Sequence, residues 1–480
     1  MHTHLDIGPF LGCLLCALVL LASSSASAET YPPPPAPTDS SRWGEHIQRT
    51  MALLATSTPP RRNKVRVLFY GQSITEQEWT KLVADDLRRR FPEADLDIQN
   101  RALGGFSSQV LVKTAEQDLY PFYPDLLIFH VYGDHRRYED SLARTRQRTA
   151  AEVVLMTDHW GADTDKSGQL VDSKWGEFMD ECLHKVAAKY GCEVVEVKQP
   201  WAEYLTANHL KAQALLKDGI HLNDHGNYLM AELAKRQLLY RPEVQTEQSR
   251  GLVREYEVGK HAQWEGDTLT LEFDGNRVDV LSARAAGAPA VSAEVLIDGR
   301  RPSSFPALYA FTKPTGMVQP KRWPSVMQAM SKKPRLVEDW SCELTAINAD
   351  NSVFRFKGAG SVTGLDGEGV NTEKFVSNSG WVVIEPDDWC VQRSFELMHE
   401  PVTPGMRTEW KCVPEFVDTY APPEAADPVR EYPSALALGL PNGKHTLELR
   451  GRVPVKLIRI YRPPIRADER PLYETDGPKG

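Results

Sequence analysis

A serine and a histidine that could act as nucleophile and base lie far apart in this chain. Ser73 occupies the turn Gly71-Gln72-Ser73, directly after a short apolar run, and Asp218 precedes His221 by three residues. A serine hydroxyl is a poor nucleophile unless a neighbouring base takes its proton. An aspartate in the same loop can hydrogen-bond the imidazole and fix its tautomer. Each motif alone is common, but together they predict a Ser-His-Asp triad for acyl transfer.

An alternation of strands and helices would position these residues. Short, nearly continuous apolar runs predict buried strands at 65–70, 96–99, 125–132, 152–157 and 192–197. Helical spacing of apolar residues predicts helices at 79–90, 109–119, 174–190 and 226–239. This order is typical of an α/β, flavodoxin-like parallel sheet with helices on both faces, over residues 63–245. In such a sheet active sites lie beyond the carboxyl ends of the strands, and Ser73 follows one of these ends.

Taken together, the two motifs resemble those of the SGNH (GDSL-like) hydrolase superfamily. Its first block is a Gly-Asp-Ser-like turn after the first strand, and its last is Asp-x-x-His shortly before the final helix; both occur here in that order. The resemblance covers residues 63–245. It implies an ester hydrolase with Ser73, Asp218 and His221 as the catalytic triad and with no cofactor. Gln72 replaces the family's Asp, as it does in sugar O-acetyl esterases that resemble this superfamily.

The resemblance also implies which groups would bind the oxyanion of the tetrahedral intermediate. Backbone N–H groups of Ser73 and of a glycine after the second strand would donate, and Gly105 matches that glycine. The family's third block, Gly-x-Asn-Asp, adds an asparagine side chain that Gly133-Asp134-His135 lacks. Loss of one such donor typically lowers kcat by ~10²–10³. Three explanations stay open: His135 donates instead, Asp134 is turned away or protonated, or the site is weak or inactive.

Polar and aromatic residues after the third and fourth predicted strands are expected to line the substrate pocket. Tyr138 follows the third strand, and Asp158, His159 and Trp160 follow the fourth. Aspartate and histidine can also form metal sites, but the triad requires no metal, so we expect a substrate pocket and no metal site. Six tryptophans of the C-terminal half could form a glycan-binding face or belong to the core: Trp264, Trp323, Trp340, Trp381, Trp389 and Trp410.

The C-terminal half has the pattern of an all-β domain. Residues 246–466 alternate strand-like runs with turn residues, which predicts a β-sandwich or jelly roll. Asp-Gly-Asn at 274–276, Asp-Gly at 298–299 and Asn-Gly at 442–443 each follow such a run and predict turns between strands. This arrangement resembles that of secreted carbohydrate esterases, which is an analogy of architecture.

The N-terminal segment predicts export, and the C-terminal end is a polar tail. Residues 1–28 contain an apolar stretch and an Ala-Ser-Ala cleavage pattern, which predicts a signal peptide, although no Lys or Arg precedes the stretch. Residues 29–62 begin with a Pro-rich stretch, and the apolar residues after it are spaced as in a helix. We therefore expect a linker with a short helix. Residues 467–480 form a polar tail.

Five cysteines follow the expected signal peptide, and this odd number leaves at least one of them unpaired.

Composition and charge exclude several classes of protein. The 480-residue chain is 41% hydrophobic and 25% charged, as soluble globular proteins are, and its formal net charge is −9. Because a phosphate backbone attracts clustered Lys and Arg, we expect no nucleic-acid partner. We expect a periplasmic or secreted hydrolase, free of the membrane after signal cleavage, that removes acetyl or similar acyl groups from a carbohydrate. The alternatives are an inactive glycan-binding protein of the same fold, and a lipase or thioesterase.

Overall fold

The computed structural model describes residues 31–164, 170–171, 174–317, 323–331, 333, 335–399, 402–427, 429–470 and 473. The expected signal peptide, 1–28, lies outside the described residues, as does most of the expected polar tail. The chain divides into two compact units, residues 1–32 and 33–480, and every element below belongs to the second unit.

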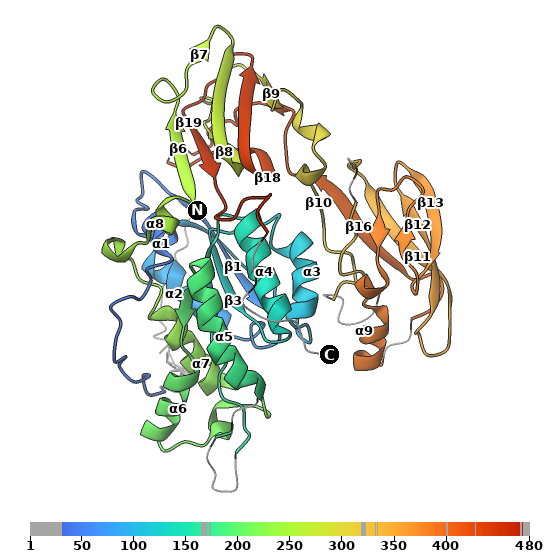
Figure 1. The fold of residues 1–480 in the computed structure, drawn as a ribbon. Helices are drawn as coiled ribbons and strands as arrows, with labels where there is room; N and C mark the ends of the chain where they lie inside the picture. The colour runs from blue at the N-terminus through green and yellow to red at the C-terminus, as the bar shows by residue number, and fades with distance from the viewer. Residues whose placement is uncertain are drawn as a thin grey trace, which may run out of the picture. The chain divides into compact units, whose positions relative to one another are not determined.

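A five-stranded parallel sheet, in the order β2-β1-β3-β4-β5, forms the first half of this unit (Figure 1). Its strands are β1 (Lys64–Gly71), β2 (Asp95–Asn100), β3 (Leu126–His130), β4 (Glu152–Met156) and β5 (Glu193–Val195). Every residue of β3 and β4 is buried, because helices cover both faces of the sheet. This strand order is that of flavodoxin-like sheets, so the predicted fold of the first domain is confirmed.

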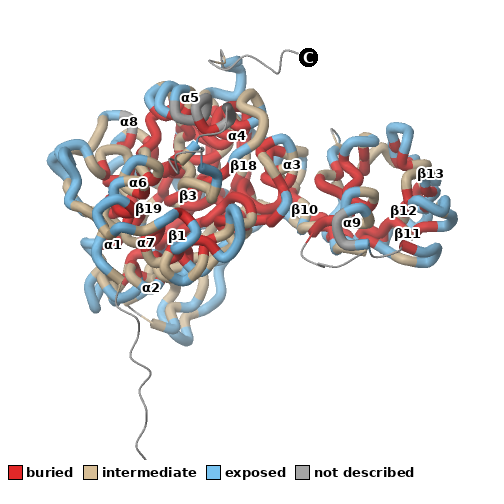
Figure 2. Tube along the Cα trace, turned by 90° about the horizontal axis from the view of Figure 1, so that it is seen from below, coloured by how far each residue is buried: buried red, intermediate tan, exposed pale blue. Residues whose placement is uncertain are grey.

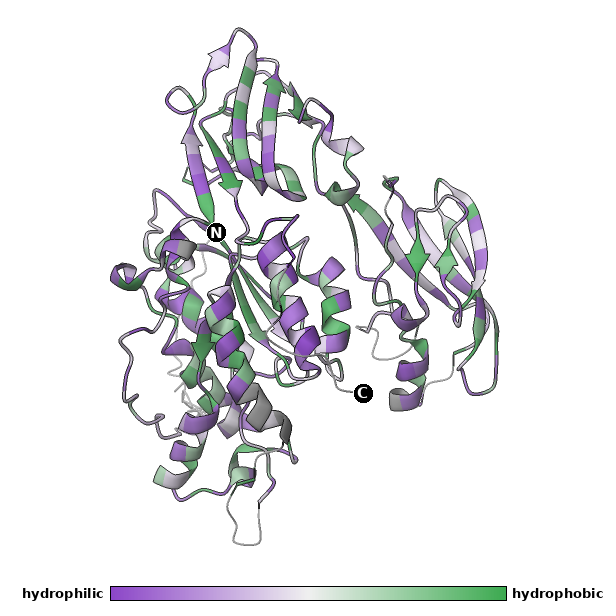
Figure 3. Cartoon of the chain, viewed as in Figure 1, coloured by the Kyte–Doolittle hydropathy of each residue, from purple (hydrophilic) through white to green (hydrophobic). Residues whose placement is uncertain are grey.

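Two sets of helices pack on the two faces of the sheet. One hydrophobic core takes in α1 (Gln48–Ala55), α2 (Trp79–Arg90), α6 (Lys198–Ala207) and α7 (Asp224–Lys235). The other takes in α3 (Ser108–Asp118), α4 (His135–Arg148) and α5 (Lys174–Tyr190). Alternate residues of β1 belong to different cores. Val67 and Phe69 pack in the first core, and Leu68 and Tyr70 pack in the second. Figure 2 shows β1 and β3 buried between these layers, and Figure 3 shows the strands as hydrophobic and the helices as striped.

The second half is β-rich, as predicted, and consists mainly of two antiparallel sheets with separate cores. The larger sheet contains β6 (Val253–Glu257), β7 (Trp264–Glu265), β8 (Thr268–Leu281), β9 (Ala293–Ile297), β17 (Thr419–Tyr420), β18 (Pro433–Arg450) and β19 (Leu457–Tyr461). The smaller contains β10 (Tyr309–Phe311), β11 (Asp339–Ile347), β12 (Phe354–Gly360), β13 (Gly364–Val370) and β16 (Arg407–Pro414). Since β10 to β16 lie between β9 and β17 in sequence, we name residues 309–414 the β-insert.

Short elements complete the described fold. The β-insert also contains β14 (Phe375–Val376), β15 (Val383–Ile384), η5 (Pro386–Asp388) and α9 (Val391–Met398). Elsewhere lie α8 (Glu247–Arg250), η1 (Ala212–Leu215), η2 (Pro242–Val244), η3 (Pro302–Ser304) and η4 (Pro306–Leu308). Within the described residues, no helix is both long enough and apolar enough to cross a membrane.

Two of the three turns predicted in the β-rich half are wrong. Residues 274–276 lie within β8 and 442–443 within β18, and Gly275 lies opposite Gly443, although the pairing of the two strands shifts register between Leu438 and Gly443. Gly275 is required for close approach of the strands, because a Cβ there would lie 2.4 Å from the carbonyl oxygen of Tyr461 on β19. The turn at Asp298 and Gly299 is present, with φ of 51° and 70° at these two residues.

The asparagines of the two wrong turns are buried and hold neighbouring segments. Asn276 accepts a hydrogen bond from the Tyr123 hydroxyl at 2.6 Å and donates to the Arg148 carbonyl at 2.8 Å. Asn442 donates to the carbonyl of Pro463 at 2.9 Å. Tyr123 and Arg148 belong to the parallel-sheet half, so Asn276 ties the larger β-sheet to it. Asparagines whose sequence context predicts a turn therefore make hydrogen bonds to distant segments instead.

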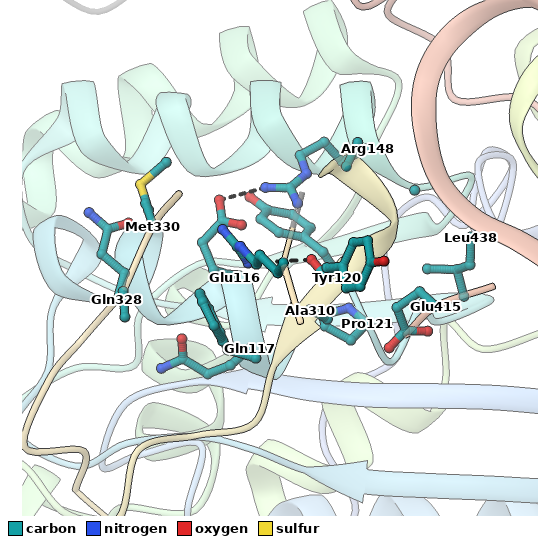
Figure 4. Close-up of a pocket in the computed structure, with 16 residues that line it drawn as sticks. Glu116, Gln117, Tyr120, Pro121, Arg148, Ala310, Gln328, Met330, Glu415 and Leu438 are labelled. Atoms are coloured by element: carbon teal, nitrogen blue, oxygen red, sulfur yellow. Dashed lines mark hydrogen bonds and ion pairs between the residues drawn. The ribbon is translucent and has the colours of Figure 1, made fainter. Parts of the chain in front are cut away.

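The β-insert meets the parallel-sheet half at a small pocket beside α3, which Figure 4 shows. Its volume is about 80 Å³, and Glu116 and Tyr120 lie in it opposite Ala310 of β10. The guanidinium of Arg148 lies 3.9 Å from the centre of the Tyr120 ring and is paired with Glu116.

The described tryptophans and cysteines of the β-rich half are mainly core residues. Trp323, Trp340, Trp389 and Trp410 are buried, which favours the packing interpretation over an exposed glycan-binding face. All five described cysteines are free thiols: Cys182, Cys192, Cys342, Cys390 and Cys412.

Candidate active site

Ser73, His221 and Asp218 lie within hydrogen-bond distance of one another beyond the carboxyl end of β1. Ser73 Oγ is 3.0 Å from His221 Nε2, and His221 Nδ1 is 2.9 Å from Asp218 Oδ2. Both distances fall in the range expected for a nucleophile, its base and the group that orients the base. The structure thus brings together the three residues that the sequence suggested as a triad.

A tight turn carries Ser73 from β1 into the cleft. The turn requires Gly71, because a Cβ there would lie 2.2 Å from the carbonyl oxygen of His130 at the end of β3. Thr75 donates a hydrogen bond to the same carbonyl at 3.1 Å. Ser73 is therefore fixed against the neighbouring strand of the sheet.

The loop that carries His221 is ordered mainly by its own aspartate. Asp218 Oδ1 accepts the backbone N–H groups of His221 at 2.7 Å and of Ile220 at 2.8 Å. These two bonds and the bond with the imidazole lower the pKa of the Asp218 carboxyl to about 2. An ionised Asp218 accepts from His221 Nδ1, which leaves Nε2 as the acceptor for the Ser73 hydroxyl; this tautomer is inferred from the network.

Gly105 occupies the third position of a turn from Leu103 to Phe106, closed by a 3.2 Å hydrogen bond from Phe106 N to Leu103 O. Its φ of 79° is a left-handed value that favours glycine. Among the described residues, neither the Gly105 N–H nor the Ser73 N–H has a hydrogen-bond partner. Both residues line the same cleft. Two backbone donors without a partner among the described residues therefore belong to residues that line this cleft.

Comparisons with known proteins found matches among solved structures. No protein-family model matches the chain, and no curated protein matches it. A solved two-domain esterase (CEX) active on acetylated mannans is 14% identical, with a TM-score of 0.35, over 87% of this chain and 95% of its own. A catalytic mutant of Axe2, an acetylxylan esterase from Geobacillus stearothermophilus, is 14% identical, with a TM-score of 0.33, over 40% and 100%. The acetyl xylan esterase AlAXEase is 20% identical, with a TM-score of 0.32, over 36% and 100%.

The similarity between this chain and these solved structures is low. At these identities and TM-scores it adds nothing to the assignment of a function, which depends on the chemistry of the site in this chain.

An open cleft of about 1130 Å³ surrounds Ser73. Charged side chains on its walls include Glu76, Glu78 and Lys217, and Tyr132 and Ile220 form an apolar rim. Tyr132 is 42% exposed and Ile220 57% exposed, so both are accessible to a bound ligand. The cleft therefore suits a polar, hydrated ligand with a small apolar face.

Asp134 and His135 are not among the described residues that line this cleft, which corrects the expected third oxyanion donor. Asp134 caps α4, where its Oδ1 accepts the backbone N–H of Arg137 at 2.8 Å. Its carboxylate is thus engaged at a helix N-terminus, which agrees with the explanation that Asp134 is turned away. Desolvation lowers the pKa of His135 to about 4, so this side chain is neutral at pH 7.

Tyr138, Asp158 and Trp160 do not line the cleft either, although we expected them in the substrate pocket. Tyr138 is buried in the core, where its ring centre lies 5.3 Å from that of Phe129. Asp158 Oδ1 lies 3.1 Å from His130 Nε2. The Trp160 indole donates to the Lys198 carbonyl at 2.9 Å. Each of these side chains is engaged with the surrounding protein, and the described residues contain no group of three or more metal-binding side chains.

His159 is also absent from the cleft wall, but it supports the catalytic loop from behind. Its Nε2 lies 2.7 Å from the carbonyl oxygen of Ile220, and the neighbouring Gly219 carbonyl accepts from Ala162 N at 3.0 Å. Burial lowers the pKa of His159 to about 4. At neutral pH the uncharged imidazole is therefore assigned as a donor to this loop through Nε2.

Sequence reasoning missed three residues that shape the cleft. Tyr132 could have been found, since it lies in the third block, directly before Gly133. Trp323 of the β-insert lines the cleft, and Arg393 of α9 donates to the carbonyl of Gly105. Their sequence context carries no signal for this position, because both come from a separate part of the chain.

Proposed function

We propose that this protein is a serine-dependent carboxylic ester hydrolase that removes acetyl or similar acyl groups from a carbohydrate. The proposal depends on one observation: the hydrogen-bonded series from Ser73 Oγ through His221 to Asp218 in an open cleft. A serine with a positioned base and an oriented imidazole is the arrangement that acyl transfer requires.

The reaction proceeds through an acyl-enzyme. Ser73 Oγ attacks the ester carbonyl while its proton moves to His221 Nε2, and the N–H groups of Ser73 and Gly105 bind the resulting oxyanion. The carbonyl re-forms, the bond to the sugar oxygen breaks, and His221 returns the proton to that oxygen. Water then attacks the acyl-enzyme with His221 as base, which releases the acid and restores Ser73. Asp218 stays ionised throughout and stabilises the imidazolium.

The walls of the cleft support a carbohydrate ester over a long-chain lipid. Glu76, Glu78 and Lys217 present charged groups that can hydrogen-bond sugar hydroxyls, and Tyr132 offers an exposed ring for the apolar face of a sugar. A lipase needs a continuous apolar channel for its acyl chain, and charged walls would raise the cost of burying one.

Replacement of Ser73 tests the proposal. Ser73→Ala is expected to abolish hydrolysis of p-nitrophenyl acetate and of acetylated polysaccharides, because it removes the hydroxyl that His221 Nε2 activates. Ser304→Ala, which removes an exposed serine far from the cleft in sequence, is the matched control and should keep full activity. Unchanged activity of purified Ser73→Ala protein would refute the proposal.

A second candidate is a glycan-binding protein that keeps the fold without catalysis. It is favoured by Asp134, which stands where the family has an asparagine and whose carboxylate caps α4 outside the described lining of the cleft. A fluorophosphonate probe separates the two candidates. Ser73 becomes labelled in an esterase, because His221 activates it, and stays unlabelled in a binding protein.

Export by a signal peptide at 1–28 stays a prediction. Expression of the full chain with a periplasmic reporter fused at its C-terminus tests it, and a reporter confined to the cytoplasm would contradict it.

A further inference from the structure

Trp323 of the β-insert packs directly on the oxyanion loop. It is only 6% exposed, and a Cβ built on Gly105 would lie 3.1 Å from its Cζ2 atom. Its ring meets that of Phe106 edge to face, with centroids 5.1 Å apart. Trp323 belongs to the same hydrophobic core as α3 and α4, whereas its neighbour Val326 belongs to the core of the β-insert. The indole therefore forms part of the wall behind Gly105.

Arg393 contacts the same loop through its polar groups. It lies in the first turn of α9, and its Nη2 donates a hydrogen bond to the carbonyl oxygen of Gly105. Its guanidinium carbon also lies 5.8 Å from the centre of the Phe106 ring. One side chain thus binds both the backbone of Gly105 and the ring of the next residue.

Gly105 depends on such contacts because it has no side chain of its own to hold it. Glycine adopts positive and negative φ with similar ease, so the left-handed value of 79° is poorly enforced by the residue itself. The Gly105 N–H and the Gly105 carbonyl belong to the two peptide groups that flank its Cα. Trp323 fills the space beside this Cα, and Arg393 fixes the carbonyl side. Together they restrict rotation that would swing the N–H away from Ser73.

The β-insert is seated next to this loop by polar contacts with α3. Lys113 Nζ is 2.9 Å from Asp388 Oδ1, and Gln117 donates to the Met327 carbonyl at 3.0 Å. Asp388 is buried, so its pair with Lys113 is shielded from solvent. Since α3 starts at Ser108, these contacts hold the β-insert against the helix that follows the oxyanion loop.

We propose that Trp323 and Arg393 are positioning residues that hold the Gly105 N–H in the oxyanion site, so that the β-insert forms part of the catalytic unit. This inference rests on the proposed esterase function. An oxyanion donor acts only when it is preorganised toward the developing charge, and small displacements lower the rate strongly. An oxyanion donor stabilises the transition state more than the bound substrate, so its displacement should lower kcat and change substrate binding little.

Kinetics of the full-length protein test this role. Arg393→Ala and Trp323→Ala are each expected to lower kcat for p-nitrophenyl acetate by about 10- to 100-fold, with little change in KM. The loss should be smaller than the ~10²–10³ typical for complete loss of an oxyanion donor, because the Gly105 N–H is displaced but still present. Arg393→Lys should recover part of the loss, since an ammonium can still donate to the Gly105 carbonyl. Arg407→Ala, an exposed arginine on β16 whose side-chain contacts lie within the β-insert, is the matched control and should keep wild-type kcat.

Each kcat is divided by the concentration of sites that fluorophosphonate titrates, so loss of folded protein is not mistaken for loss of catalysis. A wild-type kcat per titrated site in both alanine variants would overturn the role of these residues and leave the esterase proposal intact. The role would also be overturned if Arg407→Ala lost as much activity as Arg393→Ala. A wild-type protein that neither hydrolyses the ester nor becomes labelled at Ser73 would instead refute the proposed function.

Discussion

Two loops meet at Ser73, and they are held in different ways. The loop with His221 is ordered by bonds within a few residues: Asp218 accepts two backbone N–H groups and the imidazole. The loop with Gly105 has its own turn hydrogen bond and a 2.9 Å bond from Leu103 N to the Gly71 carbonyl, and Gly105 itself is contacted by Trp323 and Arg393 from the β-insert. His221 is thus held mainly by an aspartate three residues away, whereas Gly105 is contacted by a part of the chain that folds around a separate core.

This difference has a physical reason. A carboxylate can satisfy several nearby donors at once, so an aspartate can order a short loop locally. A glycine that donates only its N–H has no such group, so neighbouring segments must supply the order. The two kinds of support should respond differently to substitution.

The largest effect is expected from the locally held loop. Asp218→Asn should lower kcat by about 10⁴-fold, by analogy with the loss of the orienting aspartate in serine proteases, because an amide can stabilise the wrong imidazole tautomer. The backbone bonds to residues 220 and 221 can still form, so the melting temperature should change little. Steady-state kinetics and thermal unfolding of the purified variant check this, and a kcat within about tenfold of wild type would contradict it.

Alanine at a glycine of each loop tests the contrast directly. Gly105→Ala should lower kcat by about 10²-fold, the cost of one displaced oxyanion donor, since its Cβ would press on Trp323 at a left-handed φ. Gly219→Ala in the other loop should be tolerated, because no atom lies within 4 Å of the added Cβ. Activity on p-nitrophenyl acetate measures both. Equal losses in the two variants would show that the two loops are equally sensitive and would remove the contrast between them.

The smallest effect concerns His159, a side chain distant in sequence that lies behind the His221 loop. The pKa of His159 is lowered from the ordinary histidine value of 6.5 to about 4 in the folded protein, because burial disfavours the charged imidazolium. Between these values the unfolded chain binds the proton and the folded protein does not. Stability should therefore fall as pH decreases from 6.5 to about 4, by about 3 kcal/mol from this group.

Urea unfolding at several pH values, compared with His159→Gln, measures this contribution. The variant should lose less stability than the wild type over this window, because it has no imidazole to protonate. Parallel curves for the two proteins would contradict the prediction.

The β-rich half shows why local patterns mislead where strands pair over long distances. Asp-Gly-Asn at 274–276 has the composition of a hairpin turn. Yet Gly275 lies within β8 opposite Gly443, and Asn276 binds Tyr123 and Arg148 of the parallel-sheet half. Glycine and asparagine are also suited to close backbone approach and to buried polar contacts, and the pattern cannot tell these uses apart.

The sequence by itself predicted the five strands of the parallel sheet, four of the helices around it (α2, α3, α5 and α7), and the three residues Ser73, Asp218 and His221, which the fold brings together. Continuous apolar runs must be buried on both faces, and residues that follow such strands meet at one edge of the sheet. Only the tertiary structure decided that Asp134 caps a helix, that His159 lies behind the catalytic loop, and that Trp323 and Arg393 reach Gly105. The cap is a local contact, but the contacts of His159, Trp323 and Arg393 join segments far apart in the sequence, so they depend on how these segments pack and leave no trace in local spacing.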